Sequence, residues 1–230
     1  MMSSMCAVHL NAPSVVTCRR CGRFCCTNCL PQFETCPECV ARTTVAVPPV
    51  TERATLAIGG LWVAAGSHVV MAAVAIAQVV YAEDSAVLSI VSGLVSISNF
   101  FVVVLTILFV CVWFHRATMN ALARGAQLEV DSPAAAVVSW FIPILNLARP
   151  FNITRGMLVS AGRDPAPVAA WQGMWIVGNI TSYASGQFFS GPEGFGLNIL
   201  SDALLVGAAL TLIQIVRSLK WPEASDLQRS

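Results

Sequence analysis

Residues 132–163 read SPAAAVVSWFIPILNLARPFNITRGMLVSAGR, and they decide how the chain meets a membrane. The apolar part, residues 133–148, has sixteen residues, which is about 24 Å as an ideal helix against a hydrocarbon core of about 30 Å. Ser132 followed by Pro133 is typical of a helix start, whereas Pro143 removes the backbone hydrogen bond to the carbonyl of Ser139. The stretch therefore predicts a proline-broken helix that does not cross.

The part after Pro150 has the one-sided pattern of an amphipathic helix. Its apolar face comprises Ile153, Met157, Leu158 and Ala161, and its other faces carry Asn152, Arg155 and Arg163. Such a helix suits the boundary between lipid and water. We therefore expect residues 132–163 to form a re-entrant or interfacial hairpin.

The composition is that of a multi-pass membrane protein. Of the 230 residues, 56% are hydrophobic and only 11% are charged, where a soluble domain has about 25% charged residues. The net charge of +1 offers no overall field to attract nucleic acid. The first ten residues lack the basic and apolar segments of a cleavable signal peptide, so we expect the N-terminus to stay on the side of synthesis.

Four runs with few or no charges are long enough to cross a bilayer, namely residues 54–81, 85–114, 166–190 and 197–216. With the hairpin, they predict an all-α membrane domain over residues 54–217. A cysteine-rich module, residues 1–45, precedes this domain. A linker at residues 46–53, which contains Pro48 and Pro49, separates the two, and residues 218–230 form a tail.

The distribution of Lys and Arg predicts the topology, because these residues collect in cytoplasmic loops. With four crossings and a hairpin that returns to its own side, all thirteen Lys and Arg residues are cytoplasmic, and so are both termini. The loops at Glu83 and Glu193 then lie outside. A fifth crossing by the hairpin would place the basic C-terminal tail outside, and we reject it. The expected location is the cytoplasmic membrane.

The module contains four pairs of metal-binding residues, each with two residues between its members. The pairs are Cys6 with His9, Cys18 with Cys21, Cys26 with Cys29, and Cys36 with Cys39. Two such pairs supply the four ligands of a structural Zn²⁺ site, so the chain is predicted to bind two zinc ions. Cys25 is left over and is an alternative to Cys26 in the third pair. Whether the pairs combine sequentially or in a crossed manner is not determined by their spacing.

A disulfide framework is the alternative reading of these cysteines. The two-residue spacing, the histidine in a ligand position and the missing signal peptide favour metal. So short a module cannot build an adequate hydrophobic core, whereas metal binding of about 10 to 16 kcal/mol per site supplies the folding energy. We therefore expect the module to be unfolded without metal.

The order of the four pairs resembles the B-box type of zinc finger. This resemblance covers only the module, and it implies a crossed arrangement. Cys6, His9, Cys26 and Cys29 would then bind one ion, and Cys18, Cys21, Cys36 and Cys39 the other. It also implies a protein-interaction role. Arg19, Arg20 and Arg23 lack interleaved aromatic residues, so we interpret them as a solvated basic surface rather than a nucleic-acid site.

Two stretches of the membrane domain carry a second resemblance. They are WFHRATMNA at residues 113–121 and SPAAAVVSWFIPILNLARP at residues 132–150. They resemble a bacterial family catalogued as a domain of unknown function, number four-three-two-eight, from about the first span to Arg217. The resemblance implies a bacterial multi-pass membrane protein.

Several polar residues of the membrane domain are candidates for a site. Arg116 and Asn120 share a helical face at the inner end of the second span, and we expect them, with Asn146, to satisfy the carbonyl groups freed at Pro143. The alternative for Arg116 is an anchor at the cytoplasmic surface.

Two further residues of the spans are ionisable. His68 is expected to make a hydrogen bond between helices or to face a pore, and Asp202 to lie at the outer interface rather than on an ion pathway. The small residues at Ser89 and Gly93 suit close packing within the bundle or a homo-oligomer contact.

Enzyme is the weakest function class, because none of the hydrolase, metalloprotease or phosphate-binding motifs occurs. We interpret the chain as a membrane-anchored adaptor or regulatory protein that recruits a protein partner through the zinc module. The alternative is a small transporter or channel-like protein whose broken hairpin lines a polar cavity.

Overall fold

The computed structural model describes residues 5–6, 9, 12–19, 21–29, 36, 38–39, 50–81, 86–130, 132–188 and 192–219. The cysteine-rich module contains strand β1 (Val16–Thr17), strand β2 (Phe24–Cys25) and the 3-10 helix η1 (Thr27–Cys29). The two strands pair in an antiparallel sheet. The tail and most of the predicted linker lie outside the described residues.

The membrane domain is helical throughout. Its helices are α2 (Thr51–Val80), α3 (Ala86–Ala123), α4 (Pro133–Val138), α5 (Pro143–Asn146), α6 (Arg149–Ser160), α7 (Ala166–Phe188) and α8 (Pro192–Ser218). Helix α2 begins at Thr51, inside the predicted linker and just after the two prolines. Helices α3 and α8 extend beyond the predicted spans, most of all α3, which continues for nine residues beyond the predicted end at Phe114, whereas α7 ends at Phe188, inside its predicted span.

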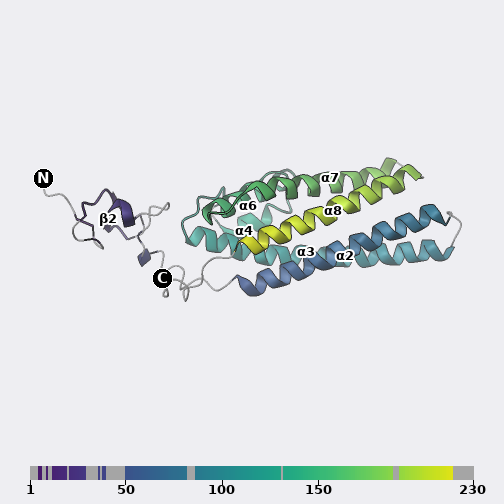
Figure 1. Cartoon of the computed structure of the whole chain (residues 1–230), viewed down its shortest axis with the longest axis horizontal. Coiled ribbons are helices and arrows are strands. Elements are labelled where there is room, and N and C mark those ends of the chain that lie inside the picture. The colour runs from purple at the N-terminus through teal and green to yellow at the C-terminus, as the bar shows by residue number, and fades with distance from the viewer. Residues whose placement is uncertain are drawn as a thin grey trace.

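Two helical hairpins form the long part of the domain, α2 with α3 and α7 with α8 (Figure 1). Helix α2 also packs against α8 and so joins the two hairpins. Helix α2 begins and α8 ends at the same end of the bundle, where α4 and α6 also lie (Figure 1). At Gly178 of α7, an added Cβ would approach the side chain of Leu205 to 3.0 Å, so a larger residue would separate α7 from α8.

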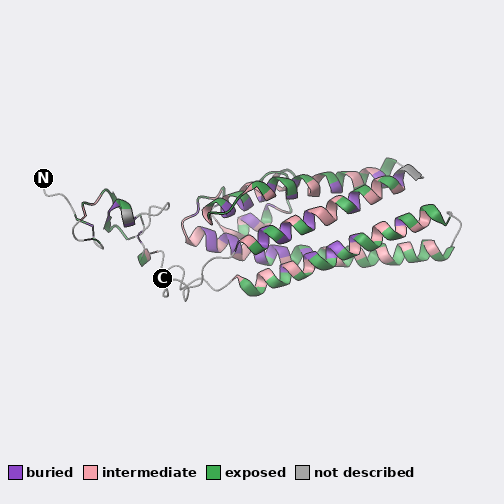
Figure 2. Ribbon diagram, viewed as in Figure 1, coloured by how far each residue is buried: buried purple, intermediate pink, exposed green. Residues whose placement is uncertain are grey.

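Among the described residues, three helices are long and apolar enough to cross a membrane: Thr51–Val80, Ala86–Ala123 and Gly194–Ser218. Helix α7, which the sequence predicts as a further span, is a 23-residue helix but is not among the three. It carries several polar residues, among them Gln172 and Asn179, which lower its hydropathy. Long stretches of α2 and α3 are exposed (Figure 2), and many of their exposed side chains are large and apolar, as lipid contact requires.

The face of α3 that carries Ser89 and Gly93 is exposed, and no atom lies within 4 Å of a Cβ added at Gly93. These small residues therefore do not serve packing within the chain.

The best-packed region surrounds the last three turns of α3. Trp113, Phe114, Ala117 and Ala121 are buried there, and α4 and α6 pack against this part of α3. Phe114 makes an edge-to-face contact with Trp140, at 5.4 Å between ring centroids, and Trp140 lies 5.7 Å from Trp171 of α7. The short helices are therefore held by protein contacts at one end of the bundle.

The predicted helix break occurs, but it is placed differently. The hydroxyl of Ser132 accepts a hydrogen bond from the backbone N–H of Ala135 at 3.2 Å, as an N-cap should. Helix α4 then ends at Val138, and Pro143 begins α5 instead of interrupting a helix. The reason is steric, because proline disfavours helical geometry in the residue before it, and Ile142 is extended with φ −96° and ψ 113°.

Helix α6 has the predicted apolar face, with Ile153, Met157 and Leu158 fully buried. The expectation that this face rests on lipid is wrong, because it packs against protein. The hydroxyl of Thr118 on α3 lies 3.9 Å from the sulfur of Met157.

Candidate metal centre and polar residues of the membrane domain

The β1–β2 turn positions the second ligand pair. The backbone N–H of Cys18 donates to the carbonyl of Arg23, and the N–H of Gly22 donates to the carbonyl of Cys18, both at 2.8 Å. Gly22 has φ +71°, a conformation that residues with a side chain rarely adopt, and it turns the chain directly after Cys21. Cys18 and Cys21 thus form a knuckle, in which a tight turn brings two ligands together.

Similar turns shape the first and third pairs. The N–H of Cys29 donates to the carbonyl of Cys26 at 3.0 Å within η1. The N–H of Ala12 donates to the carbonyl of His9 at 2.9 Å, and the N–H of His9 points to the sulfur of Cys6 at 3.4 Å. Local backbone hydrogen bonds therefore bring together the two members of each of the first three pairs.

The four pairs combine into two tetrads, in each of which all ligand atoms lie within 4.8 Å of one another. The first tetrad is Cys6, His9, Cys26 and Cys29, and the second is Cys18, Cys21, Cys36 and Cys39. The structure thus joins the first pair with the third and the second with the fourth. This is the crossed arrangement that the B-box resemblance implied, and sequential pairing is excluded.

The spacing of the ligand atoms fits a tetrahedral metal site. With Zn–S bonds of about 2.3 Å and Zn–N bonds of about 2.0 Å, tetrahedral geometry sets S···S at about 3.8 Å and N···S at about 3.6 Å. The sulfur atoms of Cys21 and Cys36 are 3.7 Å apart, and those of Cys6 and Cys29 are 3.5 Å apart. The Nδ1 atom of His9 lies 3.1 Å from the sulfur of Cys29 and 3.4 Å from that of Cys26. These distances are far longer than a disulfide bond, and all nine cysteines are free thiols.

The raised pKa values of cysteines in the two tetrads indicate that these thiols ionise readily only beside a cation. Burial, reinforced by the thiols of Cys6 and Cys26, raises the pKa of Cys29 to about 12. In the second tetrad, the hydrogen bond with Cys21 and then burial raise the pKa of Cys39 to about 12. Four thiol or imidazole groups packed together resist ionisation unless a divalent cation neutralises them, and Zn²⁺ binding requires the thiolate form.

Cys25 lies outside both tetrads. It is buried in β2, where its thiol points to the carbonyl of Arg23 at 3.7 Å, so the third pair uses Cys26. Arg23 itself forms an ion pair with Glu38 at the surface. Arg20 lies outside the described residues.

The structure does not join the polar residues predicted for the hairpin. Asn120 is buried on α3, and its Oδ1 atom has no hydrogen-bond partner among the described residues. The guanidinium group of Arg116 contacts the sulfur of Met119 at 3.9 Å, and its Nε atom is also buried without a partner in the described part of the chain. Asn146 follows Pro143 in α5, and in the described part of the chain no hydrogen bond connects it to Asn120 or Arg116.

Gln172 of α7 donates hydrogen bonds to backbone carbonyl groups of the hairpin. Its amide nitrogen donates to the carbonyl of Asn146 at 3.2 Å and approaches that of Leu147 at 3.4 Å. Sequence reasoning missed this residue, although a glutamine in an apolar run is itself a sign of a hydrogen-bond role.

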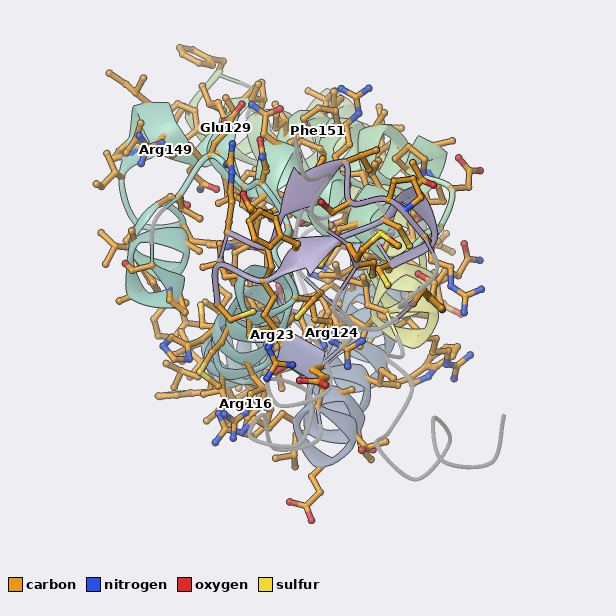
Figure 3. The ribbon with its side chains drawn as sticks, turned by 90° about the vertical axis from the view of Figure 1, so that its left-hand side faces the viewer. Arg23, Arg116, Arg124, Glu129, Arg149 and Phe151 are labelled. Atoms are coloured by element: carbon orange, nitrogen blue, oxygen red, sulfur yellow. The ribbon has the colours of Figure 1, made fainter. Side chains whose placement is uncertain are left out.

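Viewed from the end that carries the short helices, Arg116 and Arg124 lie far from Arg149 (Figure 3).

We expect Gln172→Leu to destabilise the protein by about 1 to 3 kcal/mol, because the buried amide that donates to the part-buried carbonyl groups of Asn146 and Leu147 is lost. Asn120→Leu should be neutral or stabilising, because it removes a buried oxygen that has no partner. Equilibrium unfolding in mixed micelles measures both variants. A loss from Asn120→Leu as large as that from Gln172→Leu would contradict the assignment.

The family comparison agrees with this division of the chain. Residues 57–220 match the family described as Domain of unknown function (DUF4328). The chain belongs to this family. The DUF4328 region covers most of α2 and every later helix, and it leaves the cysteine-rich module outside. No curated protein and no solved structure matches the chain.

Proposed function

We propose that this DUF4328 protein is a membrane-anchored adaptor or regulatory protein of the bacterial cytoplasmic membrane. Its N-terminal module binds two zinc ions and recruits a protein partner. The observation that carries the proposal is the pair of complete tetrads, each with four protein ligands. A zinc ion held by four protein ligands has no open position for a substrate, so such a site supports structure and presents a surface.

The donor set favours zinc over other metals. One tetrad offers three sulfur atoms and one imidazole, and the other offers four sulfur atoms. Soft ligands in tetrahedral geometry are typical of structural zinc. The buried cluster of the module consists of cysteines, so metal binding takes the place of an apolar core.

Four crossings with both termini in the cytoplasm form part of the proposal. Helix α7 lies at the same depth as α8, which supports its crossing despite its lower hydropathy. The hydroxyl of Ser201 donates to the carbonyl of Gly178 at 2.9 Å, and that of Ser185 donates to the carbonyl of Gly194 at 2.7 Å. These contacts join the second half of α7 to the first half of α8, so the two helices lie side by side in this region.

Single cysteines test this topology in intact cells. Tyr81→Cys and Phe188→Cys, both at exposed positions, should react with a membrane-impermeant thiol reagent, whereas Arg163→Cys should react only after permeabilisation. The unmodified chain is the control, because its thiols lie in the module or are buried at Cys111. An unreactive Phe188→Cys would show that α7 does not cross.

A transporter is the second candidate, and buried polar atoms without partners favour it. The side chains of Trp113, Arg116, Asn120 and Trp140 each contain one such atom among the described residues. Against it, the hairpin carbonyl groups of Asn146 and Leu147 accept hydrogen bonds from the protein itself, through Gln172.

The adaptor proposal is tested by comparing proteins that co-purify with three forms of the full chain. The forms are the unaltered protein, the double variant Cys18→Ser and Cys36→Ser, and Cys25→Ser. Loss of the same specific partners from the double variant alone is expected, because only that variant lacks a tetrad. Partners that stay bound to the double variant would overturn the proposal.

A further inference from the structure

One ionisable pair lies in the interior of the membrane domain. The Nδ1 atom of His68 on α2 is 2.8 Å from the Oδ1 atom of Asp202 on α8, and both residues are 9% exposed. Asp202, which we expected at the outer interface, is buried against α2. Only the fold brings these two residues together, since 134 positions separate them.

The pair lies at the depth of the hydrocarbon core. His68 is twelve residues from the end of α2 at Val80, or about 18 Å along the helix, and further still from its start at Thr51. Both distances are larger than half the thickness of a hydrocarbon core of about 30 Å. Asp202 is likewise eight residues inside the candidate span that begins at Gly194.

The neighbouring residues form a polar layer across all four long helices. The hydroxyl of Ser67 donates to the side-chain oxygen of Asn99 on α3 at 2.7 Å. On α8, the hydroxyl of Ser201 reaches the carbonyl of Gly178 on α7. Because Ser67 precedes His68 and Ser201 precedes Asp202, the layer connects α3, α2, α8 and α7 at one level.

On the four long helices, every other charged residue lies near a helix end, away from the pair. On α2 the other charged residues are Glu52 and Arg53 at its start, and on α8 they are Glu193 and Arg217 near its ends. Helix α3 has no charged residue before His115, and α7 has none at all; its titratable side chain is the exposed Tyr183. The charge state of the pair is therefore settled between its two members.

Proton counting shows what the pair can bind. A contact of 2.8 Å between Nδ1 and Oδ1 holds one proton between the two atoms. With that proton alone, the pair has one net negative charge. A second proton on Nε2 makes it neutral, either as imidazolium with carboxylate or as imidazole with carboxylic acid. The two states therefore differ by one unit of net charge, at a depth where net charge is costly.

We propose that His68 and Asp202 form a proton-binding site at membrane depth, where the α2–α3 and α7–α8 hairpins meet. The proton comes from hydronium in water that reaches the pair, an N–H bond forms at Nε2, and a water molecule is left behind. In the described part of the chain, His68 and Asp202 make the ion pair that joins the α2–α3 hairpin to the α7–α8 hairpin. Gain or loss of this proton therefore changes the attraction between the two hairpins. The site is independent of the zinc module.

Nitrogen NMR of the full chain in lipid nanodiscs tests the proposal. The sequence has only three histidines, His9, His68 and His115, so ¹⁵N-histidine labelling gives few signals, and His68→Gln assigns the one of interest. We expect the imidazole ring of His68 to gain or lose a proton as pH is varied, and its ¹⁵N signals to report this change. In Asp202→Asn, the amide oxygen still accepts the Nδ1 proton but the carboxylate is gone, so the signal should no longer follow the unaltered titration curve.

The control variant is Ser201→Ala, which removes a buried polar contact beside Asp202 without changing any charge. It should keep the unaltered titration curve. The exchanged variant, His68→Asp with Asp202→His, should restore a titrating ring if the pair itself is the site. A His68 signal that does not respond to pH, or one that titrates identically in Asp202→Asn, would overturn the proposal and leave a structural hydrogen bond. Neither result bears on partner recruitment by the module.

Discussion

Cys18→Ser is expected to remove one of two zinc ions from the purified full chain and to unfold the part of the module around the second tetrad. Cys18 is one of four ligands in that tetrad, and the backbone N–H of Cys36 also points to its sulfur at 3.2 Å. A structural zinc site contributes about 10 to 16 kcal/mol, which is as large as the whole stability of a typical domain. No apolar core in the described residues of the module compensates for that loss.

Elemental analysis after reducing, chelator-free purification measures the metal content. Cys25→Ser is the matched control, because Cys25 is as buried as Cys18 but belongs to neither tetrad, and it should retain both ions. Cys6→Ser should lose the other ion and leave the second tetrad intact. Two ions in purified Cys18→Ser would contradict the ligand assignment.

The module shows which part of a metal site the sequence determines. The two-residue spacing predicted all eight residues that the structure gathers into the two tetrads, because a pair needs only a local turn such as the one at Gly22. How pairs combine depends on contacts between distant segments, so spacing left it open. The choice between Cys25 and Cys26 was open for the same reason, because only the folded module shows that the thiol of Cys25 points to the carbonyl of Arg23 and belongs to neither tetrad.

The membrane domain shows the same limit. A helix break near Pro143 follows from proline geometry, and the apolar face of α6 follows from its periodicity. The donor to the hairpin carbonyl groups of Asn146 and Leu147 came from α7, 26 residues beyond Asn146, and Gln172 had no sequence signal that connected it to them. His68 and Asp202 were each recognisable as unusual, but only the antiparallel packing of α2 and α8 pairs them.

Phe114→Ala is expected to cost about 3 to 5 kcal/mol of stability, the range for removing a large aromatic side chain from a packed core. Phe114 is fully buried on α3, and its ring contacts Trp113 at 6.2 Å and Trp140 at 5.4 Å between centroids. Because Trp140 in turn contacts Trp171, the cavity left by Phe114→Ala would weaken the packing of both the short helices and the start of α7.

Phe101→Ala on the same helix is the matched control for that loss. Phe101 is 60% exposed in the part of α3 where lipid is expected, so lipid chains can replace most of its contacts and the cost should be small. Unfolding of both variants in mixed micelles gives the comparison. Equal losses would mean that the aromatic cluster does not hold α4 and α6 against α3. The hairpin would then be attached chiefly through Gln172, and Gln172→Leu, rather than Phe114→Ala, should release it from the bundle.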